Sequence, residues 1–248
     1  MNTAPPSYEA ATSAANPGAR DTKPAYTPQA QHHVFPPAFG FYHASGSNSD
    51  MRISLSAESA PLFYISTHSS FSGQPSIILN STPNPASPPL AHAALQTFSS
   101  VIDITIFSPT NQASPSPPRP LLTATFQKSG VFTAAHTFTI PIPTSGGSQT
   151  QTFEWKSSSG PEVCALQGRS HGVKLVAAGG AVVAVWAPPK SGNNKKGKMA
   201  FIDGAREEFG AAWEVMVVAT VLALMERWRR NRKRRRNNGV GAGAGAGC

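Results

Sequence analysis

The sequence predicts a mainly β protein whose strands form a closed antiparallel barrel around one hydrophobic helix near the C-terminus. Short strand-like segments separated by Pro, Gly, Ser and Asn fill most of the chain, which has 248 residues with 23 prolines and 21 glycines. One long apolar segment, 209–225 (FGAAWEVMVVATVLALM), follows them. Strands connected in sequence must hide their edges in a sandwich or a barrel, and a helix that is apolar on every side must itself be enclosed. A barrel with the helix inside satisfies both requirements.

Residues 1–50 are rich in Ala, Pro, Ser, Gln and Asn and poor in aliphatic side chains. Such a segment cannot bury enough apolar surface to offset the entropy of ordering, so we expect a disordered tail. Within it, Pro5, Pro6, Ser7 and Tyr8 form a PPxY sequence. PPxY is the ligand pattern of WW domains, in which the prolines preset an extended helix and the tyrosine fills a neighbouring pocket. The alternative is a chance match in a Pro-rich tail.

The barrel domain is expected over residues 51–236. Apolar and polar residues alternate with period 2 at 102–107 and at 121–128, as in strands with one buried face. Two Pro-rich stretches, 82–95 and 108–120, are typical of surface loops. About eleven strands are predicted, at 52–56, 62–67, 76–80, 101–108, 121–128, 137–142, 150–156, 162–166, 173–177, 181–186 and 198–203.

The apolar segment lies in a helix predicted from about residue 205 to about residue 230. Asp203 is a suitable N-cap, and basic residues stand at the far end, where the helix dipole favours them. Seventeen residues reach about 25 Å, which is short for a hydrocarbon core about 30 Å thick, and Glu214 interrupts the segment. Enclosure by the barrel is therefore favoured. The alternative is a tail-anchored membrane protein that crosses the bilayer with 209–225.

Individual residues of the barrel also have expected roles. Trp155 and Trp186 fall within predicted strands, where packing in the barrel is the expected role of a large aromatic side chain. Inside a barrel, Glu214 would reach the mouth or pair with a basic strand residue such as Lys156 or Arg169.

The net charge of +9 is concentrated locally. We interpret the main basic run as a contact for anionic phospholipids or phosphoinositides, with a solvated tail and a nuclear import signal as the alternatives. No base-reading motif accompanies it, so no specific nucleic-acid partner is expected. The candidate residues are Arg227, Arg229, Arg230, Arg232, Lys233, Arg234, Arg235 and Arg236, and a second small cluster consists of Lys190, Lys195, Lys196 and Lys198. Residues 237–248 form a Gly/Ala-rich tail that we expect to be disordered.

The sequence contains no candidate catalytic, cofactor-binding or metal-binding residues. The seven histidines lack metal-ligand spacing, and nucleophile-elbow, P-loop and dinucleotide-binding sequences are absent. We therefore expect a non-enzymatic protein without cofactors. Only two cysteines, Cys164 and Cys248, and no secretory leader predict an intracellular location, either cytoplasmic, peripheral at membranes or nuclear.

Several short sequence segments resemble those of a known family. They are Thr152-Phe153-Glu154-Trp155-Lys156, Gly160-Pro161-Glu162-Val163, Val173-Lys174-Leu175-Val176, Val183-Ala184-Val185-Trp186 and Trp213-Glu214-Val215-Met216 with its basic continuation. Together with the order of elements over about residues 52–236, they resemble the tubby C-terminal-like superfamily, which includes tubby domains, phospholipid scramblases and LURP-one-related proteins. They look like the corresponding segments of small fungal members. The resemblance implies a barrel of about twelve strands around a central hydrophobic helix.

The resemblance does not carry over the activities of that superfamily. The phosphoinositide site of tubby domains has no counterpart that can be matched position by position, and scramblase-type calcium ligands and cysteine-rich stretches are missing from the sequence. It therefore implies a binding or adaptor module and not lipid translocation.

Overall fold

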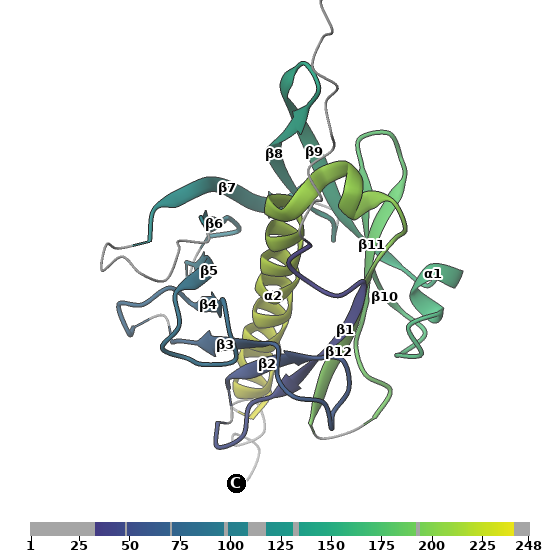
Figure 1. The fold of residues 1–248 in the computed structure, drawn as a ribbon. Helices are drawn as coiled ribbons and strands as arrows, with labels where there is room; N and C mark the ends of the chain where they lie inside the picture. The colour runs from purple at the N-terminus through teal and green to yellow at the C-terminus, as the bar shows by residue number, and fades with distance from the viewer. Residues whose placement is uncertain are drawn as a thin grey trace, which may run out of the picture. The chain divides into compact units, whose positions relative to one another are not determined.

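The computed structural model describes residues 33–240 except 48, 70, 97–98, 109–117, 131–133 and 192–193, and gives the backbone alone for 238–240. The PPxY sequence at Pro5, Pro6 and Tyr8, most of the predicted N-terminal tail and residues 241–248 lie outside this described part. Figure 1 shows the strands as a ring around the long helix α2 (Ala205–Val240).

Across the described residues, twelve strands form one closed antiparallel barrel. Each strand pairs with the next along the chain, and the last pairs with the first, which closes the sheet on itself. The strands are β1 (Ala38–His43), β2 (Met51–Ser54), β3 (Phe63–Thr67), β4 (Ile77–Asn80), β5 (Pro89–Leu95), β6 (Ile102–Phe107), β7 (Pro120–Lys128), β8 (His136–Thr144), β9 (Gly147–Ser158), β10 (Gly172–Ala177), β11 (Val182–Ala187) and β12 (Lys195–Phe201).

Side chains of the strands alternate between the barrel interior and its outer surface. In β6, Ile102, Ile104 and Ile106 are buried, whereas Asp103 and Thr105 between them are partly exposed. The inward side chains join those of α2 in one hydrophobic core. The alternation predicted for this strand is thus confirmed.

Helix α2 fills the barrel. Every residue from 213 to 224 is buried, including Trp213 and Leu222, so the helix is covered on all of its faces. Inside, Trp155 donates a hydrogen bond from Nε1 to Thr220 Oγ1 at 2.9 Å, which satisfies a buried polar group on the strand and one on the helix. The predicted barrel with a hydrophobic helix packed against it is confirmed.

Among the described residues, α2 is also the one helix that is long and apolar enough to cross a membrane. In the fold, 72% of its apolar window is buried within the protein. The core helix of a soluble protein passes the same test of length and composition, so the test does not by itself support a span.

The course of α2 differs from a straight helix that ends near residue 230. It bends at Gly210, whose φ of 77° and ψ of −179° are not helical and are adopted almost only by glycine. It then continues through the basic run to Val240. Arg and Lys are good helix formers, and Glu226 pairs with Arg229 and Arg230 on the next turn, which supports the extension.

Two strands were not predicted. β1 lies within the range expected to be a disordered tail, and β5 lies within 82–95, which was expected to be a surface loop. β5 reads PLAHAAL, a weak strand signal because alanine has low strand propensity. Its Ala91 and Ala93 are buried where β5 packs against α2, so small side chains allow the helix to approach.

The strand predicted at 162–166 is wrong. Residues Pro161–Cys164 form the short helix α1, which begins with its proline. Proline is preset for the first helical position and lacks the N–H that a strand would need. Val163 packs instead with Leu166, Val185 and Ala187 in a small cluster outside the main core. The other ten predicted strands each overlap a strand of the barrel.

Candidate anion-binding site at the barrel end

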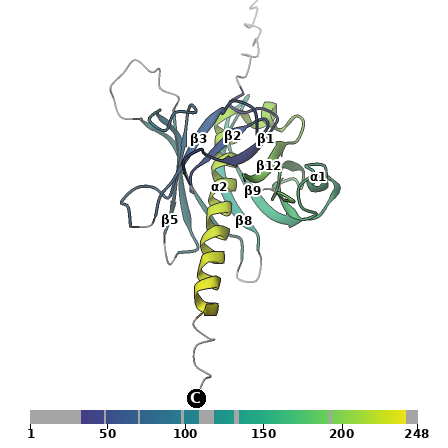
Figure 2. The same ribbon diagram turned by 90° about the horizontal axis from the view of Figure 1, so that it is seen from below.

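Helix α2 leaves the barrel at the end where β3 finishes, β4 begins and β12 begins. We call this end the basic mouth and define it by Arg169, Lys195, Lys196 and the helix residues 225–237. Residues 231–237 are exposed, and Figure 2 shows the last turns of α2 projecting beyond the strands.

A buried carboxylate lies where the helix emerges. The side chain of Glu226 is 3% exposed. Arg229 donates to it from Nε at 2.6 Å and from Nη2 at 2.7 Å, and Arg230 donates from Nε at 2.7 Å. These hydrogen bonds raise the pKa of the Arg229 guanidinium. Because two cations share one anion, the group stays net positive.

Two of the predicted ligand residues hold the helix to the rim of the barrel. Arg227 donates from Nη1 to the carbonyl oxygen of Ser100 at 2.8 Å, and Arg230 donates from Nη2 to that of His68 at 3.2 Å. Burial lowers the pKa of Arg227. Their role in the structure is to position the exit of α2.

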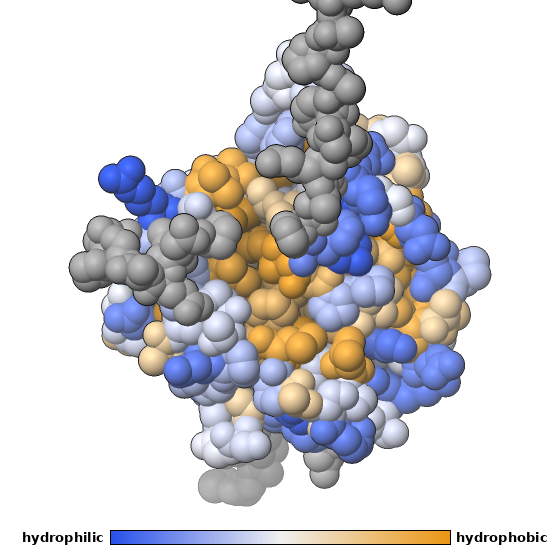
Figure 3. Space-filling model, in the orientation of Figure 1, coloured by the Kyte–Doolittle hydropathy of each residue, from blue (hydrophilic) through white to orange (hydrophobic). Residues whose placement is uncertain are grey.

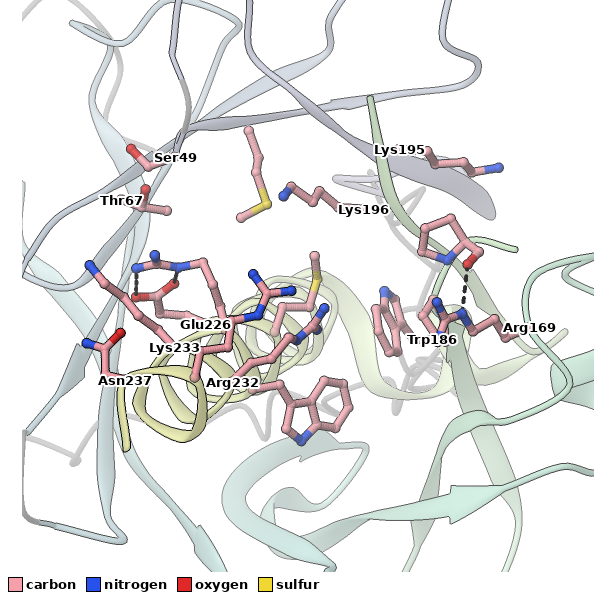
Figure 4. A pocket seen from close by; sticks show the side chains of 17 residues that line it. Ser49, Thr67, Arg169, Trp186, Lys195, Lys196, Glu226, Arg232, Lys233 and Asn237 are labelled. Carbon is pink, nitrogen blue, oxygen red and sulfur yellow. Dashed lines mark hydrogen bonds and ion pairs between the residues drawn. The ribbon is translucent and has the colours of Figure 1, made fainter. Parts of the chain in front are cut away.

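A cleft of about 830 Å³ opens between α2 and the strands of the basic mouth. Figure 4 shows Lys196 and Arg232 approaching it from opposite sides, one from β12 and the other from α2. Among the described residues that line it, seven are basic and one, Glu226, is acidic. The basic residues are Arg169, Lys195, Lys196, Arg229, Arg232, Lys233 and Arg236.

Positive charges crowd together in this cleft. Burial lowers the pKa of Lys196, and the charges of Arg229 and Arg232 lower it further. Burial, and then the charge of Lys196, also lower the pKa of His43. A bound anion would offset this repulsion through charge-assisted hydrogen bonds. The arrangement can therefore hold a phosphate or another polyanion.

Two tryptophans form an apolar wall of the cleft. The ring centroids of Trp186 and Trp228 are 5.3 Å apart, and the planes are tilted by 38°. Trp186 lies over Gly197, where an added Cβ would overlap the indole Nε1, so a larger residue does not fit. That Nε1 is buried and has no hydrogen-bond partner among the described residues. The close packing fixes β12, and with it Lys196, beside the helix.

The structure divides the eight predicted residues into groups. Arg229, Arg232, Lys233 and Arg236 line the large cleft, and Arg227, Arg229, Arg230, Lys233 and Arg234 line a smaller cleft of about 370 Å³ on the other side of α2. Arg235 is exposed. Sequence reasoning missed Arg169, Lys195 and Lys196 as part of the site. The signal for the lysines was their own small cluster, which only folding brings to the helix.

At the opposite end, where α2 enters the barrel, Glu214 is fully buried. Its carboxylate accepts hydrogen bonds from the backbone N–H groups of Val34 at 2.9 Å and Phe35 at 3.0 Å and from Arg206 Nε at 3.3 Å. His33 Nδ1 lies 2.7 Å from the same carboxylate. Glu214 therefore fastens the segment before β1 to the helix. On the outside of this end of the barrel, Figure 3 shows apolar residues gathered in the centre, with hydrophilic ones around them.

The partners suggested for Glu214 were wrong. Lys156 pairs with Glu154 at 2.8 Å, and Arg169 lines the cleft at the basic mouth. The sequence could not indicate His33, which is distant in the chain, or Arg206, whose approach depends on the bend at Gly210.

Within the part of the chain that the structure describes, no group of three or more His, Cys, Asp or Glu side chains could hold a metal ion. No protein-family model matches the chain, and no curated protein and no solved structure matches it either. The described residues thus show a closed twelve-stranded barrel around a helix, and membership of the tubby C-terminal-like superfamily stays a prediction from the sequence.

Proposed function

We propose that this protein is a non-enzymatic, intracellular binding module that attaches to anionic phospholipid membranes through its basic mouth. The observation that supports this proposal is the meeting of two basic clusters in one cleft: Lys195 and Lys196 from β12, and Arg232 and Arg236 from α2. The anionic lipids of the cytoplasmic leaflet are a partner of matching charge.

The expected energy of this contact is electrostatic. Each basic residue near an anionic leaflet contributes about 1 kcal/mol. Arg232, Lys233, Arg235 and Arg236 are exposed, so together they would raise the affinity about a thousandfold over that of a neutral surface. Salt reduces this effect because the screening length falls from about 10 Å at 0.1 M to about 3 Å at 1 M. Phosphoinositides, with additional phosphates, would bind more tightly than lipids of single charge.

Cosedimentation of the full chain with vesicles tests the proposal. One set of vesicles contains phosphatidylcholine alone, a second also contains phosphatidylserine, and a third contains a phosphoinositide. We expect binding to the anionic vesicles only, and a steep loss of binding as the salt concentration rises. Binding that is equal at low and high salt would exclude the electrostatic mechanism.

Two charge reversals separate the basic mouth from the general charge of the protein. Arg232→Glu acts in the cleft, whereas Arg119→Glu makes the same change next to the start of β7, at the opposite end of the barrel. We expect Arg232→Glu to weaken binding to anionic vesicles about tenfold or more. Arg119→Glu should stay within about twofold of the wild type, because it lies beyond a screening length from the surface. Equal losses would show that the mouth is not the contact.

A second candidate function is that of a tail-anchored membrane protein in which α2 crosses the bilayer. The length and apolar composition of α2 allow a span, and the burial of the helix in the barrel opposes it. A WW-domain partner that binds Pro5, Pro6 and Tyr8 is a further proposal, which rests on the sequence alone.

A further inference from the structure

The turn between β3 and β4 carries an unusually exposed aromatic residue. The side chain of Phe71 is 95% exposed. The turn is held in shape by Ser72, whose N–H and hydroxyl group both donate to the carbonyl oxygen of Ser69, at 3.2 and 2.8 Å. Gly73 completes it with a φ of 71°. Local hydrogen bonds therefore present the ring to the surroundings instead of folding it onto the barrel.

Phe71 lies at the basic mouth. It lines the smaller cleft of about 370 Å³ together with Arg227, Arg230 and Arg234 of α2. The same turn is tied to the helix, because Arg230 donates to the carbonyl oxygen of His68, next to Ser69. An apolar ring and several guanidinium groups thus stand side by side on one surface.

The other exposed large apolar side chains of the described residues lie at the opposite end of the barrel. These are Leu55, which is 57% exposed, and Leu121, which is 56% exposed. Leu55 follows Ser54, the last residue of β2, and Leu121 follows Pro120, which pairs with the last residue of β6. Among the described residues, the combination of an exposed aromatic ring with clustered arginines therefore occurs at the basic mouth alone.

We propose that the β3–β4 turn is a membrane-insertion element, in which Phe71 enters the boundary between headgroups and acyl chains while the arginines of α2 contact the phosphates. This inference rests on the proposed function and adds an orientation to it: the protein meets the bilayer with the basic mouth, and its barrel axis points toward the membrane. The partner is a lipid surface, because the arginines bind negative charge and the exposed ring is stabilised by an apolar layer. A membrane surface offers both, with phosphates above the acyl chains. Interfacial binding elements combine these two residue types for the same reason.

Phe71→Ser is the primary test, with Leu55→Ser as the matched control at the opposite end. Both side chains are mostly exposed, so neither change should alter the midpoint of thermal unfolding. On phosphatidylserine vesicles at low salt, we expect Phe71→Ser to weaken binding about tenfold and Leu55→Ser to leave it unchanged. The dependence on salt should be the same in Phe71→Ser as in the wild type, because the charges remain.

A fluorescent reporter measures the insertion directly. In Phe71→Trp, added vesicles with brominated acyl chains should quench the new tryptophan, and in Leu55→Trp they should not. If Phe71→Ser binds like the wild type and Phe71→Trp is not quenched, the insertion is wrong while the electrostatic attachment stands. If the wild type itself does not bind anionic vesicles at low salt, the proposed function is wrong, and so is the inference that rests on it. Loss of binding in both serine variants would also overturn it, because the effect would then not be local to the mouth.

Discussion

At the scale of single residues, Glu214 shows how far sequence reasoning reaches. One acidic residue inside an apolar helix is visible in the sequence, and it predicts that the carboxylate either reaches the mouth of the barrel or pairs with a basic residue. The identity of the partners depends on the path of the chain, which brings His33, Val34 and Phe35 to the helix. A carboxylate removed from water is tolerated only when such groups satisfy it.

We predict that Glu214→Ala lowers the free energy of unfolding by about 3 kcal/mol or more, because it leaves the Arg206 Nε–H and two backbone N–H groups without their acceptor. Glu207→Ala is the matched control. Glu207 also contacts His33, at 3.3 Å, but its side chain is 62% exposed, so the loss should be within about 0.5 kcal/mol. Urea denaturation of the two variants measures the difference, and similar midpoints would contradict the prediction.

At the scale of elements, the sequence predicts strands and helices where a strong local pattern exists. The period-2 alternation of β6 and the continuous apolar segment of α2, which is apolar on every side, are such patterns, and both were predicted. β5 was missed because its alanines reflect the close approach of α2, a tertiary requirement with no local signal. α1 was mistaken for a strand although Pro161 favours a helix start. The bend at Gly210 could not be predicted, because glycine adopts many conformations.

The bend at Gly210 brings the first turn of α2 back toward the barrel. In a straight helix, Arg206 and Glu214 would be about 12 Å apart along the axis, whereas Arg206 Nε lies 3.3 Å from the carboxylate. We predict that Gly210→Ala destabilises the fold by about 1 to 3 kcal/mol, because the φ of 77° at this position strains an alanine backbone. A Cβ there would meet no other atom within 4 Å, so the loss would come from strain and not from a clash. Gly146→Ala is the control, since its Cβ also meets open space and its φ is not in the left-handed region. Equal unfolding midpoints would show that the bend carries no strain for alanine.

At the scale of the whole molecule, the barrel and the helix depend on each other. Withdrawing α2 into a bilayer would empty the barrel and expose apolar side chains such as Ile53, Ile65 and Phe153, which are now fully buried. The gross cost of exposing about a dozen of them is about 20 kcal/mol or more. The closed architecture was predicted from the sequence because strands and a fully apolar helix must both be enclosed. The approach of Lys196 to Arg232 was not predicted, because these two residues meet only after the barrel has closed.

This dependence predicts the outcome of alkaline carbonate extraction of membranes from cells that express the full chain. We expect release into the soluble fraction, because the buried helix is not available to the bilayer and alkaline carbonate removes proteins attached by charge. An integral membrane protein in the same sample, retained in the pellet, is the control. Retention of this chain with that control would instead establish the tail-anchored alternative.

The pairing of β1 with β12 affects how the protein folds during its synthesis on the ribosome. Phe39 and Met199 are partners in the closing seam, and α2 follows the seam in the chain. Translation therefore delivers the whole wall of the barrel before the helix that fills it. Contacts between such distant parts of a chain form slowly, and the early strands present unpaired edges in the meantime. The nascent chain must stay soluble until α2 emerges, so chaperones that shield extended apolar strands should be among its first contacts in the cell.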